Sequence, residues 1–454
     1  MGVNNQSLIE KIKNIYDIVK EKANDINDIE LYMSKSSEEE FIVRERDLDK
    51  YTFAESIGIG IRIIKDGRVG ISFTEKIDNE KDLEILIENA KISMKHSMPE
   101  EYNTLTKEDN NIKEYTFNMI NENIINLSSD TLTKLSLDIE DKLYSLDKKI
   151  DNVPSAGIGR YKFQKAIINS NGICKEEIKN SISYFAEVIA KENDIVKTGF
   201  DIYNSTNEVF DKDSFCRNVV YNAINKLNAK PIKSDKYKTI FSNKAMRTII
   251  GAYLGLFSAE SVQKQISLFK DKLDKQVANS IINIKDIPLL ENGLANTNFD
   301  GEGSTTKNLT IIENGILKNF LYNNYTAKKD SKQTTAHATR GFKTPIGISC
   351  HNFMLEQGNY NLEELIKKID NGILVTSLSG VHSGVNSISG DFSLQSEGIK
   401  IENGELTYTT SPFIVSGNIL DLLLNIEALA NDIDYNKSSI YAPSALIKEL
   451  SFAC

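Results

Sequence analysis

The chain has 454 residues, 40% hydrophobic and 26% charged, which is the composition of a globular protein with two to four domains, or fewer large ones. Its formal net charge of -10, without a long run of Lys or Arg, argues against a general nucleic-acid binder. No apolar run is long enough to cross a membrane and the N-terminal residues lack the apolar core of a signal peptide, so we expect neither a membrane span nor secretion.

Residues 1–100 are expected to form a small α/β domain. Ser7 and Glu10 have the spacing of a capping box and precede apolar residues at helical spacing, which predicts an amphipathic helix. Strand-like runs follow, and Asp66-Gly67 lies between two of them, as in a two-residue hairpin turn. A second helix is predicted over residues 79–96. This order of elements indicates a layer of helices on a sheet.

Residues 101–229 are expected to form a middle domain of helices and antiparallel strands. Residues 101–125 are polar and aperiodic, as is typical of a linker, and a helix is predicted over residues 131–150. Alternating runs from Pro154 to about residue 204 predict strands. A further helix over residues 213–227 ends shortly before Pro231, so we place the domain boundary after residue 229.

Residues 230–454 are expected to form a large β-rich domain with a few helices. Hairpins are predicted at Asn314-Gly315 and Asn403-Gly404, because Asn-Gly between two β-rich runs favours a two-residue turn. Helices are predicted over residues 243–258, 361–369 and 418–431. The three parts together give an α+β fold.

Candidate metal ligands are few. The four histidines include no pair at i, i+4 on a helix and H-E-x-x-H is absent; they are His96, His337, His351 and His382. Cys350 and His351 are adjacent, and on a strand their side chains would point to opposite faces. The cysteines form no C-x-x-C pair, which favours free thiols in a reducing cytoplasm. Metal sites need three or more converging ligands, so we expect no metal in this chain.

Two Gly-rich segments are candidates for phosphate or cation binding. Gly58 and Gly60 lie inside a hairpin strand and not at a strand-to-helix turn, which excludes the dinucleotide fingerprint. Asp300 and Glu302 lie in the second segment, where two carboxylates would repel phosphate but could bind a cation. Solvation of a loop is the more common role of such a pair, and we favour it.

The segment from Gly380 to Gly404 is the richest candidate site. It is crowded with Gly, Ser and Asn, and Gly permits close backbone approach and positive φ. One hypothesis is a catalytic set of Ser383, His382 and Asp391, although adjacent Ser and His side chains rarely orient correctly. The structural alternative is a shaped loop in which Asp391 caps backbone amides. The residues that we single out as contacts for a peptide or partner are His382, Asn386, Ser389, Gly390 and Asp391.

Four segments of the chain have the order and spacing of one protein family. The first is GIGIRIIKDGRVGISFTE from Gly58, and the second is FDGEGSTTKNLTIIENGILKNFLYNNYTAKK from Phe299. The third is GVHSGVNSISGDFSLQSEGIKIENGEL from Gly380, and the fourth is SGNILDLLLNIEALANDI from Ser416. Their order and spacing extend over nearly the whole chain, and the segments resemble the TldD/PmbA family, most closely its PmbA (TldE) branch.

The resemblance implies a cytosolic zinc peptidase built from two kinds of chain. In this family the TldD chain carries an H-E-x-x-x-H helix and a C-terminal Cys that hold the metal, whereas the PmbA chain pairs with it and lacks these ligands. The corresponding helix here, NKAMRTIIGAYLGLFSAE, offers no His or carboxylate over residues 249–254, and the SGDFS loop has no Cys. Without a metal to lower the pKa of water, or a general base, the chain should be inert alone.

We therefore predict the non-metal subunit of a heterodimeric peptidase that acts on unfolded peptides in the cytoplasm. No cofactor is expected in this chain and Zn²⁺ is expected in the TldD-type partner, while sheet edges or loop backbone would hold an extended peptide. Contacts with nucleic acid or membrane are not expected, and a homodimer is one state that the chain could adopt alone. Two alternatives stay open. One is a self-sufficient hydrolase using His382 and Asp391, or His337, His351 and Cys350; the other is a non-enzymatic protein that modulates another factor.

Overall fold

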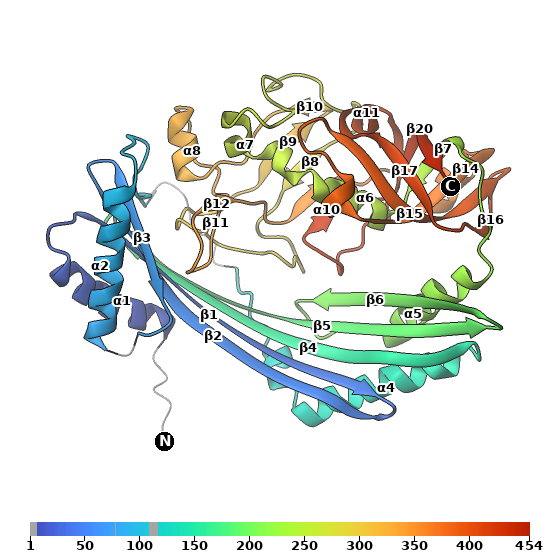
Figure 1. Ribbon diagram of the computed structural model, residues 1–454, viewed down its shortest axis with the longest axis horizontal. Helices are drawn as coiled ribbons and strands as arrows, with labels where there is room; N and C mark the ends of the chain where they lie inside the picture. The colour runs from blue at the N-terminus through green and yellow to red at the C-terminus, as the bar shows by residue number, and fades with distance from the viewer. Residues whose placement is uncertain (1–6, 78, 109–116) are drawn as a thin grey trace.

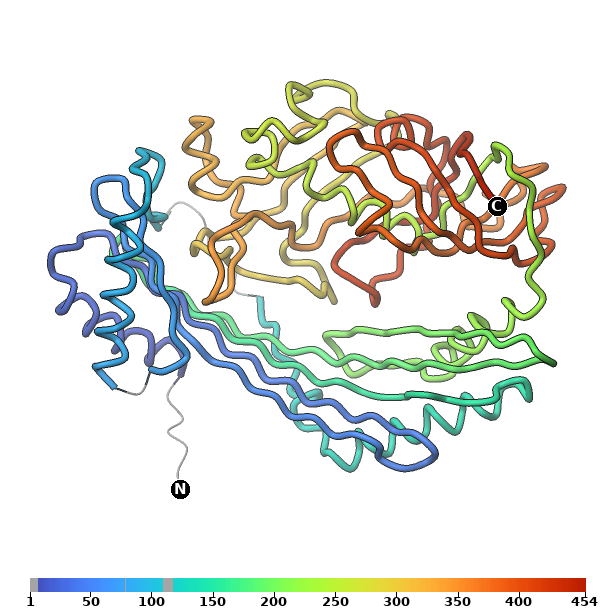
Figure 2. Tube along the Cα trace, viewed as in Figure 1, coloured from blue at the N-terminus to red at the C-terminus, as the bar shows by residue number. Residues whose placement is uncertain are grey.

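The structure is a computed structural model that describes residues 7–77, 79–108 and 117–454. A long, curved sheet forms the N-terminal half, and the C-terminal half lies against one face of it (Figure 1). The chain passes between the halves at one end of the sheet, after the last helix of the N-terminal half (Figure 2). Helices and strands both contribute to each half, so the predicted α+β class is confirmed.

The N-terminal sheet is antiparallel and follows the order β3-β2-β1-β4-β5-β6. Its strands are β1 Asp28–Arg44, β2 Asp47–Lys65, β3 Arg68–Thr74, β4 Ile150–Asn169, β5 Cys174–Glu192 and β6 Ile195–Ser205. β1 pairs with β4 from Glu30 to Val43, so strands from residues 1–100 and from residues 101–229 share one sheet. The boundary that we place after residue 100 divides this sheet and stays a prediction.

Helices cover one face of this sheet. They are α1 Leu8–Lys22, α2 Glu80–His96, α3 Glu122–Asn126, α4 Ser129–Leu146 and α5 Lys212–Leu227. Side chains alternate along a strand, so Leu31, Met33 and Phe41 of β1 lie on the same face, where they join the apolar cores under the helices. Glu30 and Tyr32 lie on the opposite face, where Tyr32 packs with Phe299 of the C-terminal half.

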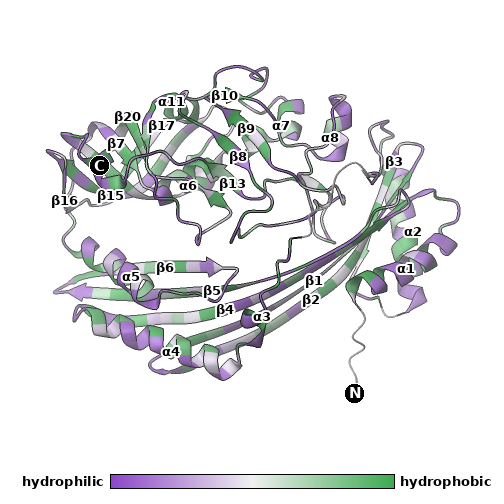
Figure 3. Cartoon of the chain, turned by 180° about the vertical axis from the view of Figure 1, so that it is seen from behind, coloured by the Kyte–Doolittle hydropathy of each residue, from purple (hydrophilic) through white to green (hydrophobic). Residues whose placement is uncertain are grey.

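A closed ring of strands forms the centre of the C-terminal half. β14, β7, β20, β17 and β15 pair in this order, and β15 pairs back with β14. The strands of this sheet are β7 Asp235–Phe241, β14 Asn371–Ser379, β15 Asp391–Glu402, β16 Glu405–Thr409, β17 Phe413–Asn418, β18 Ile426–Leu429 and β20 Ala445–Ala453. Hydrophobic residues gather along these strands (Figure 3), and Phe241, Val375 and Val415 belong to one large core. Closure leaves few sheet edges exposed.

Shorter elements surround the ring. A second sheet has the order β10-β9-β8-β13-β19, and β11 pairs with β12. These strands are β8 Ile284–Asp286, β9 Leu309–Glu313, β10 Ile316–Leu317, β11 Ala338–Thr339, β12 Gly347–Ile348, β13 Phe353–Leu355 and β19 Ile440–Tyr441. The helices are α6 Asn243–Ala252, the 3-10 helix Leu254–Phe257, α7 Ala259–Gln263, α8 Asn324–Lys329, α9 Leu362–Ile366, α10 Val381–Gly384 and α11 Ile419–Leu424. In the part of the chain that is described, no helix has both the length and the apolarity needed to cross a membrane.

Local sequence signals predict most of these elements. The capping box of Ser7 and Glu10 forms at the start of α1. At the first hairpin Asp66 has a φ of 52° and Gly67 a φ of 72°, the two positive values that a type I′ turn requires. The helix predicted over residues 418–431 is wrong beyond Leu424. β18 pairs with β20 there, so sheet pairing overrides the helical pattern.

Candidate functional site

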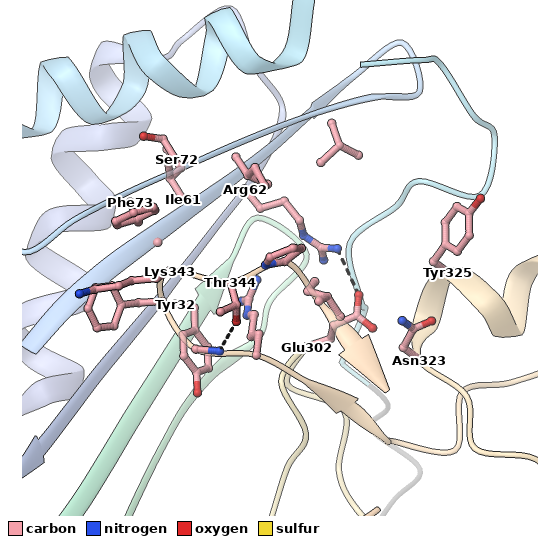
Figure 4. Close-up of a pocket in the computed structure, with 18 of the residues that line it drawn as sticks. Tyr32, Ile61, Arg62, Ser72, Phe73, Glu302, Asn323, Tyr325, Lys343 and Thr344 are labelled. Carbon is pink, nitrogen blue, oxygen red and sulfur yellow. Dashed lines mark hydrogen bonds and ion pairs between the residues drawn. The ribbon is translucent and has the colours of Figure 1, made fainter. Parts of the chain in front are cut away.

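Three adjoining cavities lie between the helix-free face of the N-terminal sheet and the C-terminal half. Cavity A, of about 630 Å³, is lined by residues that include Arg62, Glu302, Asn323 and Tyr325 (Figure 4). Cavity B has a volume of about 210 Å³ and cavity C of about 480 Å³. The cavities share lining residues in pairs, Tyr32 and Arg340 for A and B, and Phe163 and Lys179 for B and C. We call this row of cavities the groove.

Two glycines of β2 let a loop of the C-terminal half lie directly on the sheet. A Cβ atom at Gly60 would be 2.6 Å from the backbone oxygen of Phe342, and one at Gly58 would be 2.2 Å from the Phe342 ring. Any side chain at these positions would push this loop, residues 340–346, away from β2. The Gly-x-Gly pair therefore shapes the wall of cavity A by allowing close approach.

A buried cluster of charges joins the halves at the floor of cavity A. Glu30 and Arg62 are partners across β1 and β2, and Arg62 donates two hydrogen bonds to the Glu30 carboxylate, at 3.0 and 3.2 Å. Arg62 also donates to Glu302 Oε1 at 3.2 Å, while Arg340 Nη1 lies 2.8 Å from Glu30 Oε1. Burial opposes ionisation of Glu30, but Arg340 and Arg62 outweigh it and hold the pKa of Glu30 below its ordinary value.

Asp300 is held by backbone amides next to this cluster. Its carboxylate accepts hydrogen bonds from the amides of Glu302 and Ser304, each at 2.9 Å, and of Ala338 at 3.0 Å. Burial and the charge of Glu302 raise the pKa of Asp300 to about 7. The expectation of loop solvation for Asp300 and Glu302 is wrong, because both side chains are buried between the halves, at 1% exposure each.

A lysine and a glutamate form the matching pair in cavity B. Lys165 and Glu177 are partners across β4 and β5, and the Lys165 ammonium lies 3.4 Å from the Glu177 carboxylate. Lys165 also donates to Thr297 Oγ1 at 2.6 Å and to the Phe299 oxygen at 2.7 Å. Burial lowers the pKa of Lys165. The pair thus ties the sheet to the segment that contains Asp300.

Asp286, His337 and His351 form the group of potential metal ligands found within the described residues, with donor atoms within 4.8 Å of one another. His337 Nε2 lies 2.8 Å from Asp286 Oδ2 and its Nδ1 lies 2.9 Å from Thr335 Oγ1. His351 donates from Nε2 to the Ala336 oxygen at 2.8 Å, and its amide donates to Asp286. Both His337 nitrogens and both Asp286 oxygens are thus engaged. The three side chains therefore form a hydrogen-bonded cluster, and a metal at this place would have to displace the bonds between them.

Cys350 lies in cavity B beside this trio. Burial raises the pKa of the Cys350 thiol to about 12, and it lowers the pKa of His351 to about 4. Both groups are therefore neutral at physiological pH, and a protonated thiol is a poor nucleophile. The structure brings His337, His351 and Cys350 together, but their surroundings do not activate them for hydrolysis.

The predicted contact residues lie on α10, on the loop after it and, in the case of Asp391, at the start of β15, and they are not among the residues that line the groove. His382, Asn386, Ser389 and Asp391 are exposed, and Gly390 is buried with a φ of 83°. The Asp391 carboxylate accepts from Ser389 Oγ at 2.8 Å and from an Asn418 side chain at 2.9 Å. Its partners are thus Ser389 and Asn418, not His382. The role of the five predicted contact residues in binding stays a prediction.

Helix α6 presents apolar residues where the family resemblance would place metal ligands. Ile249 is 0% exposed and Ile250 is 4% exposed, and both belong to the large C-terminal core. Directly after the helix, the Tyr253 hydroxyl bonds to the backbone oxygens of Gly390 and Asp391, both at 2.9 Å. The end of α6 therefore braces the loop that holds the predicted contact residues.

Three family models match the chain, and together they cover most of it. PmbA/TldA metallopeptidase domain 1 matches residues 29–93, the central domain residues 122–229, and the C-terminal domain residues 234–454. The chain belongs to the PmbA/TldD family. The family resemblance of its four segments is thereby confirmed.

Relatives of this PmbA/TldD-family chain are named as metalloproteases. Metalloprotease PmbA of Escherichia coli O157:H7 is 29% identical over 329 residues, which are 72% of this chain and 70% of that protein. A zinc metalloprotease TldD homolog of Saccharolobus solfataricus is 27% identical over 334 residues, 68% of this chain and 74% of that protein. The crystal structure of TldE from Thermococcus kodakarensis has the same fold, with a TM-score of 0.88, 22% identity, and coverage of 98% of this chain and 100% of that one.

Sequence reasoning missed most of the residues that line the groove. The pairing of Glu30 with Arg62 could not be found by extending the register from the turn before β2, because a β-bulge between Ile42 and Val43 shifts the pairing by one residue. No local signal marks Arg340 or Lys179, because they come from separate segments that only the tertiary fold brings to the same cavity.

Proposed function

We propose that this PmbA/TldD-family chain is the metal-free subunit of a two-chain peptidase and that it holds an extended, unfolded peptide in its groove. The observation that carries the proposal is the end of α6. Residues 249–254 carry apolar side chains, with two exceptions. Gly251 has no side chain, and the hydroxyl of Tyr253 bonds to the backbone of a loop. A zinc hydrolase needs a metal-bound water and a base to take its proton, and these residues supply neither.

The groove supports the peptide part of the proposal. Its cavities follow one another along the sheet, which suits an extended chain better than a compact ligand. Amide side chains in its lining, which both donate and accept hydrogen bonds, suit the repeating backbone of any sequence; they include Asn89, Asn103 and Asn118, of which the last two also form one bond each within the chain. Aromatic rings such as Phe342 and Tyr161 add apolar surface for side chains.

The proposal assigns Zn²⁺ to a TldD-type partner chain in the cytoplasm. We place contacts with the partner or the peptide on the loop of His382, Asn386, Ser389, Gly390 and Asp391. The support is that this loop is fixed by hydrogen bonds and yet presents Ile388 at 65% exposure. An ordered loop with an exposed apolar tip suits a protein interface, because little conformational entropy is lost on binding.

Co-expression with a TldD-type chain from the same organism tests the proposal. We expect the two chains to co-purify, the complex to contain zinc and to cleave unstructured peptides, and this chain alone to do neither. Metal content is measured by mass spectrometry and cleavage by chromatography of the products. A His337→Gln variant of this chain, which alters the Asp286 trio, should leave the zinc content of the complex unchanged.

Zinc-dependent cleavage by this chain alone would overturn the proposal. The His337→Gln variant then separates two causes. If zinc bound to the isolated chain is lost in this variant, the metal sits at the Asp286 trio; if it is retained, another site in the chain holds it.

A further inference from the structure

Arg340 is a buried guanidinium whose donors are only partly used. Its side chain is 7% exposed, and Nη1 pairs with Glu30. Its Nε and Nη2 are also buried, and neither has a hydrogen-bond partner within the described residues. The guanidinium lies 4.6 Å from the centre of the Tyr32 ring. Buried donors without acceptors are costly, and they are costlier on a charged group, so the free side of Arg340 requires an acceptor.

Lys179 of β5 brings a second cation with free donors to cavity B. Its ammonium donates to the Asn296 oxygen at 3.2 Å and lies 5.8 Å from the centre of the Phe163 ring. An ammonium has three donors, and no carboxylate of the described chain forms an ion pair with this one. Burial lowers the pKa of Lys179, and a bound anion would offset that effect.

The acids around cavity B are already engaged. Glu30 is shared between Arg62 and Arg340, and Glu177 pairs with Lys165. Asp300 accepts from backbone amides and, with a pKa raised to about 7, carries only part of a charge at neutral pH. An acceptor for Arg340 and Lys179 must therefore come from outside the chain.

We infer that cavity B is a binding site for a carboxylate group of a peptide, held by Arg340 and Lys179. The inference rests on the proposed peptide groove and adds the chemical group that the groove selects. A guanidinium fork fits the two oxygens of a carboxylate. The volume of about 210 Å³ accommodates that group with a small side chain, and cavities A and C on either side leave room for the rest of the peptide.

The carboxylate is either the C-terminus of the peptide or an Asp or Glu side chain, since both present the same oxygens. Three unlabelled, unstructured peptides distinguish these sources when titrated into the full-length chain and followed by isothermal titration calorimetry. The first has neutral side chains and a free C-terminus, the second is the same peptide with an amidated C-terminus, and the third is the amidated peptide with one internal Glu.

We expect the first or the third peptide to bind at least about tenfold more tightly than the second, because a charge-assisted, bidentate contact is gained. Arg340→Gln should abolish this difference, and Lys179→Met should reduce it. The control is Arg44→Gln. Arg44 is an exposed arginine on β1 that pairs with Glu45 and lines none of the cavities, so its loss tests the effect of net charge alone.

Equal binding of the three peptides to the unaltered chain would overturn the carboxylate site and leave the peptide groove standing. Failure of all three to bind would overturn both. An equal loss of preference in Arg44→Gln and Arg340→Gln would also overturn the site, because it would mean that net charge and not cavity B selects the carboxylate. The comparison of the first and second peptides needs no variant, so it holds even if Arg340→Gln fails to fold.

Discussion

At the scale of single residues, hydrogen bonds connect segments that the sequence keeps far apart. Arg62 of the first family segment bonds to Glu302 of the second, 240 positions away. Asn418 of the fourth segment bonds to Asp391 of the third. The four segments therefore form two tertiary pairs, one at the floor of the groove and one at the loop braced by Tyr253.

Tyr253→Phe should loosen that loop. The hydroxyl that bonds to the oxygens of Gly390 and Asp391 is lost, and a neutral hydrogen bond contributes about 1 kcal/mol to the free energy of unfolding. Amides of residues 385–391 should exchange faster in hydrogen-exchange mass spectrometry. Tyr221→Phe is the matched control, since Tyr221 is 54% exposed. Unchanged exchange in the loop would contradict the bracing role.

Asp300 should make stability fall as pH rises toward neutrality. Burial and Glu302 raise its pKa from 3.8 to about 7. The contribution of Asp300 is fully present below the unfolded pKa. Between the two values the folded state keeps the proton while the unfolded chain loses it, so the contribution falls as pH rises and is lost above the folded pKa.

Asp300→Asn removes this titration. The free energy of unfolding of the variant, relative to that of the unaltered chain, should therefore rise from about pH 5 to about pH 7.5. Any constant cost of the substitution is the same at both pH values and does not change this rise. Urea midpoints at the two pH values measure the change. Asp25→Asn is the control, because the hydrogen bond from Lys91 lowers the pKa of Asp25 and keeps its titration below that range. Parallel pH dependence of the Asp300→Asn variant and the unaltered chain would contradict the prediction.

At the scale of elements, β2 and the loop of residues 340–346 depend on each other. Gly60→Ala would place a Cβ atom 2.6 Å from the Phe342 oxygen, and the backbone must move to relieve this overlap. We expect a loss of about 1–3 kcal/mol in the free energy of unfolding and faster tryptic cleavage after Lys343. Gly255→Ala is the control, since no described atom beyond its chain neighbours and its own helix lies within 4 Å of the added Cβ. Equal effects of the two substitutions would argue against the close contact.

Local signals predict elements well where the element depends only on nearby residues. The capping box of α1 and the hairpins at Asp66-Gly67, Asn314-Gly315 and Asn403-Gly404 are set by side chains and φ preferences within a few positions. β18 is not set by nearby residues, because it becomes a strand by pairing with β20, which lies later in the chain. Its apolar spacing suits a helix equally well until that partner is known.

At the scale of the whole molecule, the family segments could be found in the sequence but the groove could not. Gly58, Gly60 and Arg62 are recognisable as a motif, yet their function depends on Phe342 and Glu302 in the other half. The contact residues predicted on the Gly380 loop lie away from the groove lining. A loop rich in Gly and Ser attracts attention, whereas groove residues on long strands look like ordinary members of a sheet.

The charge cluster around Glu30 should couple the two halves of the molecule. Glu30 is 0% exposed and pairs with both Arg62 and Arg340, one from each half. Glu30→Gln leaves two buried cations with one remaining acid, Glu302. Breaking a buried pair in this way costs about 3–5 kcal/mol, so urea unfolding should shift to lower concentration and separate into two transitions, one for each half.

The matched control is Asp141→Asn, which removes an exposed carboxylate 3.2 Å from Arg46, in a pair whose side chains are 73% and 63% exposed. Such a pair contributes at most about 1 kcal/mol, because water screens both charges. A single unfolding transition in Glu30→Gln, with a midpoint no lower than that of Asp141→Asn, would mean that apolar contacts such as Tyr32 with Phe299 hold the halves together without the cluster. Separate transitions would instead place the coupling at Glu30, which holds Arg340.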